Sequence, residues 1–119
     1  MKLESLYSQA LVLLGETADS TAVSDYSSRA DYLIPGVLAE LASASEALGT
    51  PAEIPEAPAE KSADFPLDSR LTAPAAALLA SRLIRDESSE LANELDALAS
   101  RLLRFCCPPD VGHTREVYQ

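Results

Sequence analysis

The sequence predicts an all-α fold, a small bundle of about four helices. Three observations point to this class: apolar residues recur at three- and four-residue steps, Leu and Ala dominate among them, and aromatic residues make up only 5% of a chain without Trp. Leu and Ala favour helices, whereas β-branched and aromatic residues favour strands. With 119 residues, 47% of them hydrophobic, the chain has the size and apolar content of one domain with one core.

The first half of the chain carries two helical patterns. The first covers residues 3–14 and is followed by Gly15, a residue type that commonly ends helices. The second covers residues 25–48 and contains Pro35, which has no amide hydrogen to donate to the carbonyl of Asp31. We therefore expect the second helix to be kinked or broken at Pro35.

Residues 50–66 form a Pro-rich segment between the two halves of the chain. Four of the eight prolines lie here, and the apolar residues follow neither a helical nor a strand period. This composition predicts an extended loop whose centre is a candidate for disorder. Ile54 and Phe65 are the residues expected to hold its two ends.

The second half of the chain predicts two more helices. One starts near Asp68 or Thr72 and runs to Arg85, with several alanines that allow close packing. The other runs over residues 89–105 and carries a heptad-like seam, which we expect to pack inside the bundle; its members are Leu91, Leu95, Leu98, Leu102 and Phe105. These elements predict a single helical domain over residues 1–105 and an extended C-terminal tail over residues 106–119.

The formal net charge of −10 is concentrated in the first half of the chain. Residues 1–60 hold ten acidic residues against two basic ones, whereas residues 61–119 hold nine against seven. This balance disfavours binding to nucleic-acid phosphates or to anionic lipid. No apolar run reaches the roughly 20 residues of a membrane span, and no secretory signal is evident, so we expect a cytoplasmic protein with reduced thiols.

The sequence contains few residues in the arrangements that bind metals or carry out catalysis. Cys106, Cys107 and His113, with Asp110 between them, are the only group that resembles a metal site. Adjacent cysteines depart from the usual zinc spacing of two to four residues, so two partly buried thiols after a helix are the better interpretation. No nucleophile elbow, metalloprotease motif or glycine-rich phosphate loop is present, and we expect no metal, no cofactor and no enzymatic activity.

Four arginines end the two helices of the second half, and two roles are open for them. Positive charge near a helix C-terminus complements the helix dipole, and one or more of these side chains could instead contact a partner protein. The candidate interface residues are Arg82, Arg85, Arg101 and Arg104.

Three stretches of the sequence are similar to the small helical head–tail connector (adaptor) proteins that sit below the portal of long-tailed phages. They are ALVLLGE at residues 10–16, YSSRADYLIPGVLAEL at residues 26–41, and the helix–acidic break–helix pattern of residues 65–95. The resemblance implies self-association into a ring, portal and tail proteins as partners, passage of DNA through the ring, and a place in the virion neck after assembly in the cytoplasm.

Two further expectations accompany this resemblance. In a connector ring, the surplus acidic residues should lie on the lumen or the outer surface; the candidates are Glu40, Glu46, Glu53, Glu56 and Glu60. The alternative function is that of an acidic helical adaptor or regulator, which would bind one other protein through the apolar Leu seam. Closed oligomers would indicate the connector, and a small stoichiometric complex would indicate the adaptor.

Overall fold

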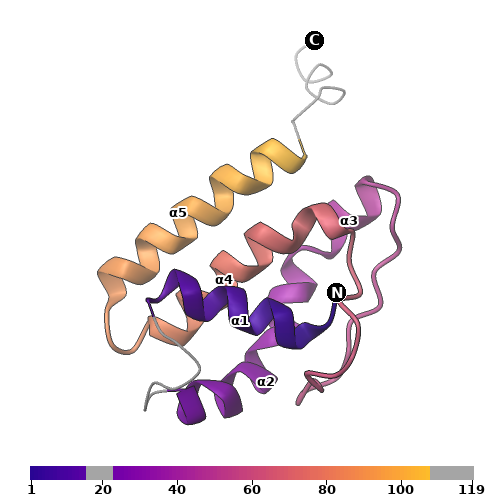
Figure 1. The fold of residues 1–119 in the computed structure, drawn as a ribbon. Helices are drawn as coiled ribbons and strands as arrows, with labels where there is room; N and C mark the ends of the chain where they lie inside the picture. Colours follow the sequence, from indigo (N-terminus) through magenta and orange to yellow (C-terminus); the bar gives the residue numbers. More distant parts are fainter. Residues whose placement is uncertain (16–22, 108–119) are drawn as a thin grey trace.

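The computed structural model describes residues 1–15 and 23–107, and within this part of the chain all regular structure is helical. Five α-helices and one 3₁₀ turn follow one another along the chain (Figure 1). Their bounds are α1 Leu3–Leu13, α2 Val23–Glu40, α3 Ala42–Ala47, η1 Ser69–Leu71, α4 Thr72–Ile84 and α5 Ser89–Cys106. The predicted all-α class and the four main helices are confirmed, and α2 and α3 together occupy the second predicted helical segment, residues 25–48.

The helix ends follow local sequence signals. The chain turns after α1 at Gly15, whose φ of 74° lies in the left-handed region that glycine adopts at little cost. Asp68 caps η1 by accepting a hydrogen bond from the amide of Arg70, and Ser88 caps α5 by accepting one from the amide of Leu91. The predicted starts of the third and fourth helical segments are therefore confirmed.

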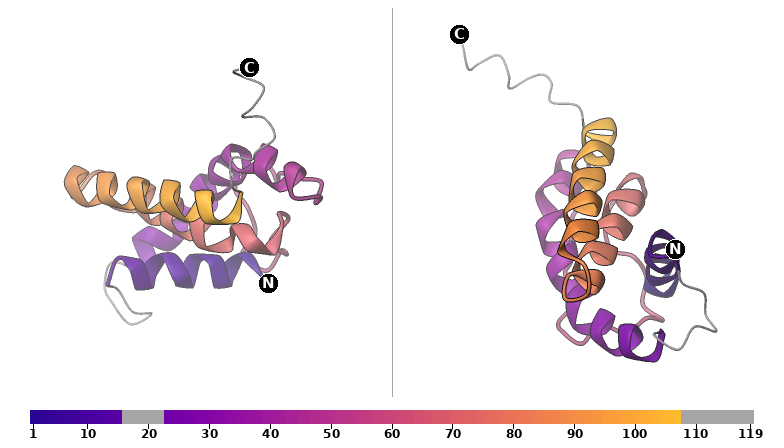
Figure 2. Two further views of the ribbon diagram at one scale, coloured as in Figure 1. Left: turned by 90° about the horizontal axis from the view of Figure 1, so that it is seen from above. Right: turned by 90° about the vertical axis from the view of Figure 1, so that its left-hand side faces the viewer.

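Helix α4 is the centre of the fold. It packs against α1, α2 and α5, and Figure 2 shows it between α1 and α5. A helix that is apolar on all sides needs neighbours on all sides, and the many alanines of α4 let the backbones of the neighbouring helices approach it closely. Its buried residues are Pro74, Ala75, Ala76, Ala77, Leu79, Ala80, Ser81, Leu83 and Ile84.

Helix α2 continues through Pro35, and the break in this helical segment lies at Leu41, so of the two expected outcomes at Pro35 the break is absent there and the kink stays a prediction. The reason is tertiary: the carbonyl of Asp31, which Pro35 cannot satisfy, accepts a hydrogen bond of 2.7 Å from the amide of Ala59. A loop segment therefore replaces the hydrogen bond that the proline removes, and the helix needs no break there.

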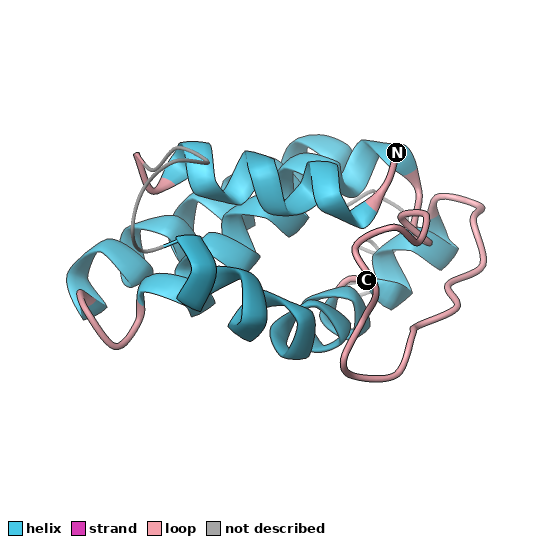
Figure 3. Ribbon diagram, turned by 60° about the horizontal axis from the view of Figure 1, so that its bottom comes forward, coloured by secondary structure: helices cyan, strands magenta, loops and turns pink. Residues whose placement is uncertain are grey.

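The Pro-rich loop lies wholly within the described residues (Figure 3), and its second half is anchored to the helices, whereas the disorder expected of its centre stays a prediction. Lys61 extends its ammonium group to the carboxylate of Asp31 at 2.5 Å and to the carbonyl of Ser27 at 2.9 Å. Ala59 is buried and Phe65 packs against the core, but Ile54 is 37% exposed and does not hold the loop. The anchors lie at the end of the loop that contacts α2.

Candidate functional site: an apolar groove between α1 and α5

A shallow groove of about 240 Å³ lies between α1 and α5, above the first turns of α4. Its lining is almost wholly apolar and comes from all three helices: Gln9, Val12, Leu13, Ala73, Ala76, Leu98 and Leu102. Helices α1 and α5 both pack on α4, and the small side chains of Ala73 and Ala76 leave space between them. Val12 is 73% exposed, so the C-terminal end of α1 presents apolar surface to solvent.

The seam of α5 is only partly buried, which corrects the expectation that it packs inside the bundle. Of its five residues Leu95 is buried, Leu91, Leu98 and Leu102 are half-buried, and Phe105 is 84% exposed. The residues of α5 that face α4 are Ala92, Leu95 and Ala99. The apolar stripe is wider than the contact with α4, and its outer edge forms one wall of the groove.

Arg82 and Arg85 are engaged inside the molecule. Arg82 forms an ion pair with Glu40 and so connects α4 to the end of α2. Arg85 donates to Asp96 at 2.7 Å and also to Ser81 and Asn93, which connects α4 to α5. These two arginines contribute to packing between helices and are not available to a partner without breaking those contacts.

Arg101 and Arg104 are different. Both are exposed, and neither has an ion-pair partner within residues 1–15 and 23–107. Together with Phe105 they line a shallow depression of about 290 Å³ at the C-terminal end of α5. An exposed aromatic ring beside two guanidinium groups that have no ion pair in the described residues is a surface that suits an acidic or aromatic partner residue.

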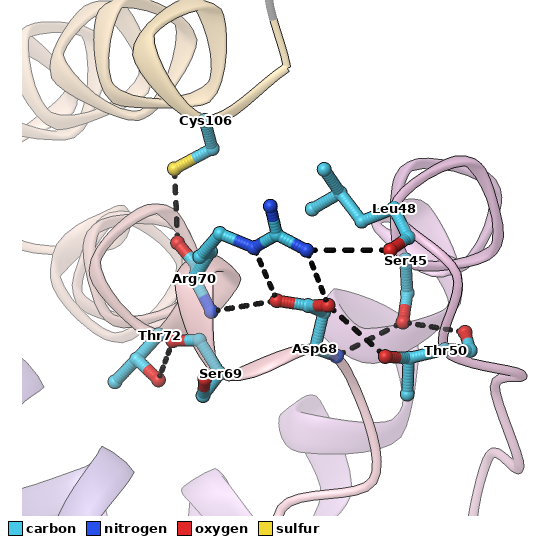
Figure 4. Close-up of polar contacts among 8 residues, drawn as sticks. All are labelled: Ser45, Leu48, Thr50, Asp68, Ser69, Arg70, Thr72 and Cys106. Atoms are coloured by element: carbon cyan, nitrogen blue, oxygen red, sulfur yellow. Dashed lines mark hydrogen bonds and ion pairs between the residues drawn. The ribbon is translucent and has the colours of Figure 1, made fainter.

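A polar cluster beside this end of α5 holds the chain together and is fully engaged (Figure 4). The carboxylate of Asp68 accepts hydrogen bonds from the backbone amide and the guanidinium of Arg70 and from the hydroxyl of Thr50. The hydrogen bonds from Arg70 are the main reason why the pKa of Asp68 lies well below its usual range, and the same contact raises the pKa of Arg70. An ionised carboxylate with this many donors is suited to structure and not to proton transfer.

The two cysteines follow the expectation of partly buried thiols after a helix. Neither is in a disulfide, and the Sγ atom of Cys106 lies 2.9 Å from the carbonyl oxygen of Arg70. Burial raises the pKa of the Cys107 thiol, and the neighbouring Cys106 adds to the effect. The thiol form is therefore favoured, and it is a poor nucleophile and a poor metal ligand.

In the described ranges no three His, Cys, Asp or Glu side chains converge as a metal site requires. Asp110 and His113 lie outside these ranges, so the expected absence of a metal stays a prediction. A larger depression of about 530 Å³ lies on the Pro-rich loop, beside Glu53 and Asp64. Asp64 is paired with Lys2 at 2.9 Å, and this depression contains no nucleophile beside a base.

Sequence patterns indicated part of this site. The Leu seam of α5 was predicted to pack inside the bundle, and only the adaptor alternative used it to bind another protein, whereas Val12 and Leu13 lie off the apolar period of the first helix and were not predicted as site residues. None of the described helices is both long and apolar enough to cross a bilayer. Comparisons of the chain with family models, with curated proteins and with solved structures gave no match.

Proposed function

We propose that this chain is a structural subunit of a phage or prophage head–tail connector, a ring that joins the portal to the tail and lets DNA pass. The observation that carries the proposal is the apolar groove between α1 and α5, which is open as far as residues 1–15 and 23–107 show, together with the nearby depression at Arg101, Arg104 and Phe105. A subunit that works by assembly needs apolar surface reserved for neighbours, because apolar contact is the main favourable term in association.

The distribution of acidic residues supports the same proposal. All five acidic residues predicted for a lumen or an outer surface are exposed, and of these Glu40 alone is in an ion pair within the described part of the chain. A channel wall that carries free carboxylates repels phosphate groups and does not retain DNA as it passes. The sequence resemblance adds the identity of the partners, which are portal and tail proteins.

The test is native mass spectrometry of the purified chain with and without a portal protein encoded beside it, across a salt series. We expect a closed oligomer in complex with the portal. Higher salt should leave it intact or favour it, because screening over about 8–10 Å reduces repulsion between subunits of net charge −10. A chain with no affinity for portal under every condition would overturn the proposal.

The adaptor function is the second candidate, and the lining of the groove favours it specifically. Two helices with apolar edges separated by small residues form a slot of the kind that accepts one amphipathic helix of another protein. Stoichiometry distinguishes the two functions: a one-to-one complex with a non-portal protein indicates the adaptor, and a large closed oligomer indicates the connector.

A further inference from the structure

The charges along α5 are arranged in two blocks. Glu90 and Glu94 lie in the first half of the helix, and Arg101 and Arg104 lie in the second half. All four are exposed, and in the described ranges none has an ion-pair partner. Isolated surface charges need no explanation, but here two unpaired acidic side chains precede two unpaired basic ones on one helix.

Two of these charges border the exposed edge of the apolar seam. Glu94 lies four residues before Leu98 and Arg101 three residues after it, so both are neighbours of Leu98 on the helix surface. In heptad terms they occupy the positions that flank the seam, where charges determine the choice and the orientation of a partner helix. On the other flank Ala92 and Ala99 are buried and carry no charge that could select a partner.

We propose that α5 pairs with α5 of a second copy of this chain, in antiparallel orientation about a two-fold axis near Leu98. In that arrangement Glu94 faces Arg101 of the second copy and Glu90 lies near Arg104, and the symmetry repeats both contacts. In a parallel pair Glu94 and Arg101 would face the side of the second helix that carries Ala92 and Ala99, so they would find no opposite charge. The charge pattern of the helix is therefore complementary to itself only when the second helix runs in the opposite direction.

The apolar residues fit the same arrangement. The two-fold axis places Leu98 against Leu98 and brings the exposed ring of Phe105 to the half-buried Leu91 of the second copy. Val12 and Leu13 border the groove and extend the apolar surface beyond α5 itself. This contact is isologous, whereas a closed ring is built from heterologous contacts, so the dimer describes the free protein and does not depend on the connector proposal.

The test uses two charge-reversal variants of the full chain, examined by sedimentation equilibrium. R101E/R104E makes all four positions acidic, and E90R/E94R makes all four basic. Each variant alone should dimerise with a Kd at least about tenfold higher than that of the wild type, because every cross-helix pair becomes repulsive. An equimolar mixture of the two should form a heterodimer tighter than either homodimer, which a merely unfolded variant could not do.

Two controls make the result specific. E46R/E56R has the same net charge as E90R/E94R but changes exposed residues outside α5, so it should dimerise as the wild type does. Phe105→Ala should raise the Kd without altering the circular dichroism spectrum, since Phe105 is 84% exposed in the single chain. A dimer that is insensitive to both reversals would overturn the proposal. The proposal would also be overturned if the wild-type protein stays monomeric at its highest soluble concentration. This holds equally if the monomer binds an amphipathic helix of another protein.

Discussion

Replacing Ser45 by Ala removes one hydroxyl that joins three segments of the chain. Ser45 lies in α3 and is fully buried; its Oγ atom donates to the carbonyl of Thr50 and accepts from the amide of Asp68, both at 2.9 Å. The amide of Asp68 is itself buried and has no other acceptor among the described residues, whereas Thr50 is half-buried. The substitution therefore leaves one backbone donor and one backbone acceptor without a partner (Figure 4).

The expected cost follows from these two groups. A buried polar group that loses its partner costs about 1–3 kcal/mol, and water can reach the half-exposed carbonyl of Thr50 more easily than the amide of Asp68. We therefore expect Ser45→Ala to lower the free energy of unfolding by about 2–3 kcal/mol, a large share of the roughly 5–15 kcal/mol typical of a domain.

Urea denaturation followed by circular dichroism measures this difference directly. Ser43→Ala is the matched control, because Ser43 is exposed on the same short helix and should change stability by less than about 0.5 kcal/mol. An unfolding free energy for Ser45→Ala within that same margin of the wild type would show that the hydroxyl drawn in Figure 4 does not hold the three segments together.

Three further predictions concern acid stability, the loop and the seam. The pKa of Asp68 is lowered in the folded chain, so its carboxylate stabilises the fold above the ordinary pKa range of Asp, and this contribution is lost as pH falls through the lowered value. Asp68→Asn should therefore lose less unfolding free energy than the wild type on acidification. Urea titrations from neutral pH downward measure this difference. Lys61→Met removes two hydrogen bonds to α2 and should speed hydrogen exchange at the amide of Ala59 by at least about tenfold, while exchange in α5 stays unchanged. Leu98→Asp places a charge at a half-buried position of the seam and should cost about 1–2 kcal/mol, not the larger penalty of a fully buried charge; a loss above about 4 kcal/mol in urea denaturation would show that Leu98 is part of the closed core.

Much of the fold follows from local patterns in the sequence. Apolar periodicity predicted all four main helices, and the caps at Asp68 and Ser88 lie where hydroxyl and carboxylate residues precede helical patterns. The continuity of α2 through Pro35 could not be predicted in this way, because the compensating donor is the amide of Ala59 in a loop with no periodicity. Helix propensities read from the sequence give the free-energy cost of a proline in a helix, but they do not reveal a distant segment whose hydrogen bond offsets that cost.

The candidate site was predictable only in part, for the same reason. The four arginines look equivalent in the sequence, yet Arg82 and Arg85 have partners on other helices while Arg101 and Arg104 have none in the described part of the chain. Which edge of the α5 seam remains open depends on where α1 lies against α4, and no local pattern specifies that. Charge order along α5, by contrast, can be read from the sequence, and it carries the proposal of antiparallel pairing.

The hydrogen bond between Asp31 and Ala59 has a consequence for the order of events during synthesis. Helix α2 leaves the ribosome before residue 59 does, so the carbonyl of Asp31 must remain bound to water until the loop has emerged. We therefore expect the middle of α2 to reach its full stability only after the loop has been synthesised, although the residues of the helix are synthesised first. In a nascent chain stopped before Ala59, the backbone of α2 around Pro35 should be less stable than in a chain that includes Lys61. Synthesis of the second half of the loop would then complete the folding of the N-terminal half of the domain.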